Sequence, residues 1–258
     1  MQVTQALLSE FRAKLAKHAS DAQSYVRAYL AAMRQAFPGM SVAECRDYAL
    51  QAIDDALVIY GNQAVDLAGD WFETLATQEG YATAFESRSV IDGAAKEAKV
   101  RWLAGKLVTG DYRGFDGGVS DLTRYYVERS AFSNLVANCD AGGIRYARVP
   151  SGTETCAFCF MLASRGFVYH SENLALFRGG TGSLYHQHCD CVVVPGFGDG
   201  FDQDAQVEGY TPSQLQKRYW QVLDEDGIRN TSDTDAVIAA LESRDARWLF
   251  TGETKSVD

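Results

Sequence analysis

Two short cysteine clusters constrain this chain more than any other feature. The first is Cys156-Ala157-Phe158-Cys159, and the second is His186-Gln187-His188-Cys189-Asp190-Cys191. A C-x-x-C turn brings both of its sulfurs to one side, and residues two apart in a strand share a face. Tetrahedral zinc takes four nitrogen or sulfur ligands, so this spacing predicts one zinc ion in a small knot.

The candidate ligands outnumber the four that zinc needs. They are Cys156, Cys159, His186, Cys189 and Cys191. The C-x-x-C pair is the firmest, two of the other three complete the shell, and His188 is a weaker substitute. A set that closes the shell leaves no open position for substrate, which favours a structural Zn2+ over a catalytic one. The alternatives are disulfide or redox pairs, or cysteines that are simply part of a core.

Known catalytic signatures are missing from the sequence. A zinc deaminase needs H-x-E before its C-x-x-C, but the one histidine before Cys156 is His18, followed by Ala19 and Ser20. There is no H-E-x-x-H, and the glycine-rich run at 179–182 lacks the lysine of a phosphate-binding loop. We therefore expect no catalytic residues and favour a protein that is not an enzyme.

Composition sets the remaining limits. The chain has 258 residues, 47% of them hydrophobic, and a net charge of −10. Residues 199–258 hold 13 acidic and 6 basic side chains, so the acidity belongs mainly to this tail, and direct nucleic-acid binding is not expected. No apolar run is long enough to span a membrane, and the first ten residues do not read as a secretory signal. Reducing surroundings inside a cell are the expectation.

Apolar periodicity predicts long helices over the first 140 residues. The first helix is expected to end at Pro38-Gly39, and a capping box at Ser41 and Glu44 opens a second that runs to about residue 76. A third is expected to start after Asp92. The glycine-rich stretch at 114–118 is expected to be a loop before a fourth helix.

The second half of the chain is expected to be mixed. Residues 144–149 and 191–194 read as strands, 197–209 as a linker, and 211 onward as a helix with proline at its first position. A last helix is expected over 236–248. The tail is predicted to be dispensable for the folding of residues 1–198.

Together these patterns predict an α+β fold that is mainly α. A helical domain at 1–143 is followed by a Cys/His zinc-binding module at 144–197, and then by a linker and acidic helical tail at 198–258. Cys45 and Cys139 lie on apolar helical stripes and are predicted core residues. The four tryptophans are predicted to serve packing or an interface rather than a ligand box.

Several short motifs surround the cysteines. They are Arg148-Val149-Pro150-Ser151-Gly152, the C-x-x-C turn, Leu162-Ala163-Ser164-Arg165-Gly166, Tyr169 and the second cluster. Together they resemble the minor head proteins of tailed phages, and in particular the phage Mu protein F-like family of actinobacterial phages and prophages. The family pattern ends H-P-x-C-x-C, and Gln187 stands here where proline is usual.

The resemblance implies a minor capsid protein of head morphogenesis that is associated with the portal vertex. Its expected partners are the phage portal protein and the head or scaffold proteins, and its expected location is the virion head, with the host cytoplasm during assembly. Some relatives are described as capsid maturation proteases. A protease, or another phage-encoded hydrolase or toxin-like effector, is therefore the alternative function.

Overall fold

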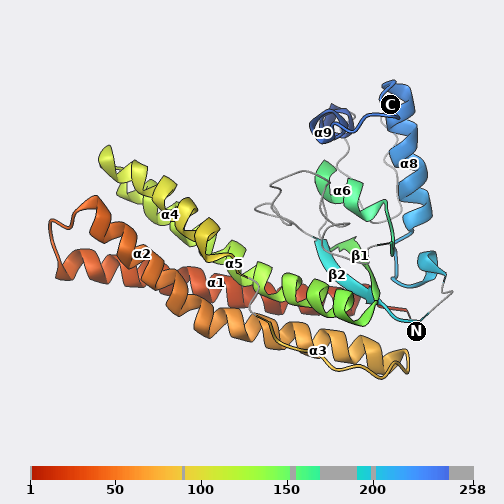
Figure 1. The fold of residues 1–258 in the computed structure, drawn as a ribbon, viewed down its shortest axis with the longest axis horizontal. Coiled ribbons are helices and arrows are strands. Elements are labelled where there is room, and N and C mark those ends of the chain that lie inside the picture. Colours follow the sequence, from red (N-terminus) through yellow and green to blue (C-terminus); the bar gives the residue numbers. More distant parts are fainter. Residues whose placement is uncertain (1, 89–90, 152–154, 169–190, 199–201, 244–258) are drawn as a thin grey trace. The chain divides into compact units, whose positions relative to one another are not determined.

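The computed structural model describes residues 2–88, 91–151, 155–168, 191–198 and 202–243 (Figure 1). The chain divides into two compact units. The helical unit comprises Ala13–Asp70 and Glu86–Asn134, and the sheet unit comprises Met1–Arg12, Trp71–Phe85 and Leu135–Asp258. The described residues are mostly helical, with one two-stranded sheet, which confirms an α+β fold that is mainly α. The predicted division at residues 143 and 197 stays a prediction.

The helical unit begins with a helical hairpin. Helix α1 (Gln5–Ala36) ends at the Pro38-Gly39 turn, and α2 (Val42–Ala56) starts after Ser41. The Ser41 hydroxyl accepts a hydrogen bond from the Glu44 amide at 3.2 Å, while the Glu44 carboxylate accepts one from the Ser41 amide at 2.7 Å. The Ser41 hydroxyl also donates to the Glu44 carboxylate at 2.7 Å, and this bond together with the one from the Ser41 amide lowers the pKa of Glu44. The predicted capping box is confirmed.

One continuous helix runs from α2 through a π-helical turn, η1 (Leu57–Gly61), into α3 (Asn62–Gln78). The prediction of a single helix to about residue 76 is therefore confirmed. The π turn coincides with a change in the spacing of buried residues along the helix. Up to Ala56 that spacing is three or four residues, but from Ala56 to Gly61 it is five. The wider turn leaves Val58 on the surface, 68% exposed.

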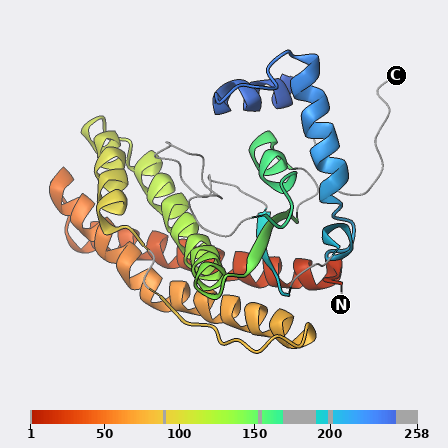
Figure 2. The same cartoon turned by 45° about the vertical axis from the view of Figure 1, so that its right-hand side comes forward.

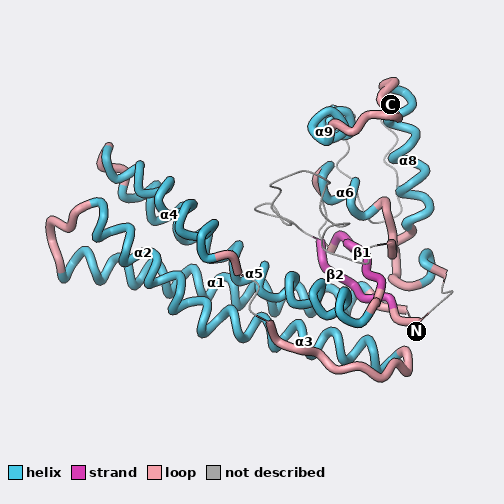
Figure 3. The backbone as a smooth tube through the Cα atoms, viewed as in Figure 1, coloured by secondary structure: helices cyan, strands magenta, loops and turns pink. Residues whose placement is uncertain are grey.

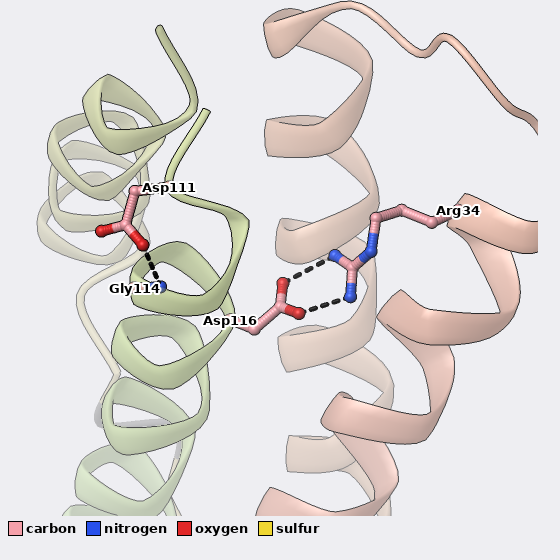
Figure 4. Close-up of polar contacts among 4 residues, drawn as sticks. All are labelled: Arg34, Asp111, Gly114 and Asp116. Atoms are coloured by element: carbon pink, nitrogen blue, oxygen red, sulfur yellow. Dashed lines mark hydrogen bonds and ion pairs between the residues drawn. The ribbon is translucent and has the colours of Figure 1, made fainter. Parts of the chain in front are cut away.

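Helix α4 (Gly93–Val108) begins at the Asp92 cap, as expected, and packs against α2. Helix α5 (Tyr112–Gly142) starts earlier than predicted, and the expected loop at 114–118 is wrong. Asp111 caps α5 by accepting a hydrogen bond from the Gly114 amide at 2.8 Å (Figure 4). A Cβ at Gly118 would lie 2.3 Å from Leu103 of α4, so glycine serves here for close helix packing rather than for a turn.

An ion pair joins the end of α1 to the start of α5. The guanidinium of Arg34 meets both carboxylate oxygens of Asp116, with Nη1 2.7 Å from Oδ1 (Figure 4). Both side chains are partly buried, and the fork geometry fixes their orientation. The α1–α2 turn and the α4–α5 turn therefore lie at the same end of the helical unit.

The sheet unit holds strands β1 (Arg145–Pro150) and β2 (Cys191–Gly196), close to their predicted positions (Figure 3). They pair antiparallel, with Arg145 opposite Gly196 and Pro150 opposite Cys191. Trp71 of α3, 4% exposed, donates its indole N–H to the Val193 carbonyl at 3.1 Å. This bond satisfies a buried backbone oxygen of β2 and ties the sheet to α3.

Three short helices complete the sheet unit: α6 (Ala157–Ala163), α8 (Pro212–Glu225) and α9 (Thr234–Ser243). Proline stands at the first position of α8, as predicted. The three helices pack together (Figure 2). Their shared core contains Ala157, Phe160, Met161, Val222, Leu223, Val237, Ala240 and Leu241. The described part of the tail is therefore packed on α6, which argues against its being dispensable for folding.

The stretch expected to be a linker is anchored where the structure describes it. Phe197 packs on Phe72, with ring centroids 5.4 Å apart, and Val207 is fully buried. Val3 pairs with Val207 in a parallel bridge, and a short 3-10 turn, η2 (Gln203–Ala205), lies between these contacts.

Candidate metal centre

Cys156 and Cys159 stand on the first turn of α6. Cys156 is the N-cap, and its Sγ accepts a hydrogen bond from the Cys159 amide at 3.4 Å. An amide aimed at sulfur stabilises negative charge there, which suits a thiolate ligand. Cys156 is exposed and Cys159 is fully buried. The turn therefore brings the two predicted ligands together, one of them at the surface.

Cys191 begins β2, where it is fully buried and opposite Pro150. Since β2 pairs with β1, and α6 packs against β1, Cys159 and Cys191 lie on elements that belong to one packed set. The antiparallel pairing at Pro150 and Cys191 is the part of the predicted knot that the described residues fix.

The other predicted ligands, His186 and Cys189, and the substitute His188 lie outside the described residues. Within the described ranges, no three His, Cys, Asp or Glu side chains are gathered closely enough to hold a metal. Cys156, Cys159 and Cys191 therefore do not form a site by themselves. The donor chemistry fits zinc, but only with a further ligand from residues 186–190 of the second cluster.

An apolar layer supports the C-x-x-C turn. Phe160 and Met161 of α6 are buried against α8 and α9. Tyr210, fully buried, donates its hydroxyl to the Ala163 carbonyl at 2.6 Å. Burial raises the pKa of Tyr219, which also packs on this cluster, while Arg165 opposes the shift.

Sequence reasoning missed these supports. The helix from residue 211 was predicted, but the elements that it packs on were not, because periodicity shows that a face is buried without showing its partner. Tyr210 gave no periodic signal. Its role depends on a contact with a residue 47 positions away.

The remaining described cysteines are core residues, as predicted. Cys45 is 5% exposed and Cys139 is fully buried. Burial raises the pKa of both thiols, so neither has the thiolate character of a reactive or ligating cysteine.

Tryptophan roles differ with position. Trp71 is a core residue, whereas Trp102 of α4 is 72% exposed. Trp220 of α8 is partly exposed and lies 5.1 Å from the guanidinium of Arg229. Trp248 is outside the described residues.

Comparison with known proteins gave one family. A family model described as VG15 protein matches residues 2–222, which include the helical unit, most of the sheet unit and both cysteine clusters. No match was found among curated proteins or among solved structures. Among the described helices, none has the length and apolar character needed to cross a membrane.

Proposed function

Because this chain belongs to the VG15 protein family, a family of viral and phage proteins, we propose that it is a structural protein of the phage head. More narrowly, we propose a minor head protein of the Mu F-like kind that joins the portal vertex during head assembly. The family match over most of the chain carries the phage assignment, and the motifs around the cysteines support the narrower one.

We infer that the docking surface lies at one end of the helical unit. Four large apolar side chains are exposed there, on the α1–α2 turn and around the α4–α5 turn: Phe37, Val42, Val108 and Tyr112. The Arg34–Asp116 ion pair holds these two turns at the same end, and the four residues are called here the helical tip. Exposed apolar groups gathered at one site are typical of protein interfaces.

The test is co-purification of the full chain with the portal protein of the phage or prophage that encodes it. A deletion of residues 1–140 would not test the helical tip alone. It would also remove Phe11 of α1 and Trp71 of α3, which belong to the sheet unit. Val108→Asp and Tyr112→Asp are expected to abolish capture. Val168→Asp, at an exposed valine of the sheet unit, is the matched control and leaves capture intact. Equal capture by all variants would refute the helical tip, and no capture of the wild-type chain would refute the portal partner.

We also propose one structural zinc ion per chain, bound by Cys156 and Cys159 with ligands from His186, Cys189 and Cys191. The capped C-x-x-C turn and the pairing of β1 with β2 at Cys191 support it. Elemental analysis of the purified chain should find one zinc, and Cys156→Ser should lose it. Cys45→Ser, at a buried cysteine of α2, should keep it. Metal-free protein with reduced cysteines would refute the proposal.

The hydrolase alternative has a separate test. Incubation with the capsid and scaffold proteins of the same phage should leave both intact. Cleavage that stops when a chelator is added would instead show a metal-dependent protease.

A further inference from the structure

A row of tyrosines lies along α1 and the helix that pairs with it. The aromatic row consists of Tyr48, Tyr29, Tyr25 and Tyr60, all of them half-buried. Ring centroids are 6.3 Å apart from Tyr29 to Tyr25 and 6.2 Å apart from Tyr25 to Tyr60. Tyr48 is near enough to Tyr29 to contribute to its raised pKa. The row therefore presents a run of partly exposed ring surface.

A carboxylate lies within the row. Asp55 accepts a hydrogen bond from Gln51 at 2.8 Å, and the Tyr25 hydroxyl lies 3.5 Å from its other oxygen. Burial raises the pKa of Tyr25 and of Tyr29, and the charge of Asp55 adds to both shifts. No lysine or arginine among the described residues forms an ion pair with Asp55. A carboxylate beside aromatic faces is a good receptor for a planar guanidinium.

The outer face of α4 has the complementary chemistry. Trp102 is 72% exposed, and its neighbours Lys99 and Arg101 are exposed as well. The helix carries four basic residues against one acidic residue, in a chain whose net charge is −10. Within the described ranges Arg101 has no ion-pair partner.

These two faces do not meet within one copy. The contact between α2 and α4 includes an ion pair between Lys96 and Asp54, while Asp55 lies with Tyr25 of α1. Arg101 is on the exposed side of α4. The helical unit therefore carries two complementary faces that can bind a second molecule. One has Arg101 next to the exposed indole of Trp102, and the other has Asp55 among tyrosine rings.

We propose that the aromatic row of one copy binds α4 of a second copy, with Arg101 against Asp55 and Trp102 against the tyrosine rings. Because two different faces meet, the contact is heterologous and joins copies head to tail, into a ring if the rotation closes and into a filament if it does not. The aromatic row adjoins the helical tip proposed for the portal, because Phe37 stacks on Tyr48 with ring centroids 6.0 Å apart, but Asp55 and Arg101 lie outside that tip.

The test is sedimentation of the full chain over a wide concentration range. We expect reversible association that weakens as salt is raised, since both partners are charged and accessible. Asp55→Asn and Arg101→Gln should each weaken association about tenfold or more. Asp47→Asn, at an exposed aspartate of the same helix that pairs with Arg46, is the matched control and should have no effect.

The decisive variant carries Asp55→Arg and Arg101→Asp in one chain. Each reversal alone should abolish association, and the double reversal should restore it. Should Asp55→Arg fail to fold, as judged by circular dichroism, Arg101→Gln at its exposed position tests the contact alone. The proposal is overturned if the wild-type chain is monomeric throughout, if Arg101→Gln associates like wild type, or if a folded double reversal associates no better than the single reversals.

Discussion

The bond from Trp71 to β2 gives the sharpest test of how the sheet is held. In Trp71→Phe the Val193 carbonyl loses the indole donor and stays buried, which costs about 1–3 kcal/mol. The smaller ring also leaves space beside Phe11, whose centroid is 4.9 Å from that of Trp71. We therefore expect the variant to lose about 2–4 kcal/mol of unfolding free energy.

Urea unfolding followed by far-ultraviolet circular dichroism measures this loss. Trp102→Phe is the same chemical change at a side chain that is 72% exposed, so its effect should stay below about 0.5 kcal/mol. The measurement belongs in dilute protein, where copies do not associate. Equal stability of the two variants would show that the indole–carbonyl bond does not anchor β2.

The remaining predictions concern the ends of helices and the tail. Ser41→Ala removes the cap of α2 and should cost about 1 kcal/mol in urea unfolding at neutral pH. The folded pKa of Glu44 lies below its ordinary value of 4.5, so the stability that Glu44 contributes is present above that value and is lost as pH falls through the folded pKa. The difference in unfolding free energy between wild type and Ser41→Ala should therefore shrink in acid. A difference that stays constant with pH would contradict this. Tyr210→Phe should cost only about 1 kcal/mol, because the Ala163 carbonyl keeps its bond from the Gly166 amide; a loss above about 3 kcal/mol would mean that the hydroxyl does more than cap this oxygen. A chain truncated after Gly198 should be insoluble or melt without cooperativity, because α6 would expose the core that it shares with α8 and α9. A soluble fragment that melts as cooperatively as the full chain would instead show that the tail is dispensable.

Local signals predicted the helices well. The capping residues Ser41 and Asp92, the proline at the start of α8 and the spacing of apolar residues each act within a turn or two of chain, so the sequence alone shows their effect. The two strands were found for a similar reason, as short apolar runs bounded by Pro150 and Pro195-Gly196.

Glycine was the main source of error. The same residue type that ends α4 at Gly110, with a φ of +76°, sits inside α5 at Gly118. At Gly110 it provides a backbone conformation, and at Gly118 it makes room for Leu103. A sequence does not separate these uses, because the second depends on which helix lies opposite.

The candidate metal site was read from spacing, and its supporting layer was not. Cys156, Cys159 and Cys191 fall on the elements expected of them, a turn and the start of a strand. The packing of α6 on α8 and α9 joins residues that are far apart in the chain. The hydrophobic effect does not specify which apolar faces pack on each other, so the partner of an apolar face is known only from the structure.

The π turn at Leu57–Gly61 holds one extra residue in the helix while the buried faces before and after it stay aligned. Removing a residue there would shorten the spacing from Ala56 to Gly61 from five to four, which an ordinary α turn accommodates. The helix beyond the turn would keep its orientation, and the Trp71 indole would still reach the Val193 carbonyl. Val58, with its side chain in solvent, should therefore accept deletion as well as most substitutions.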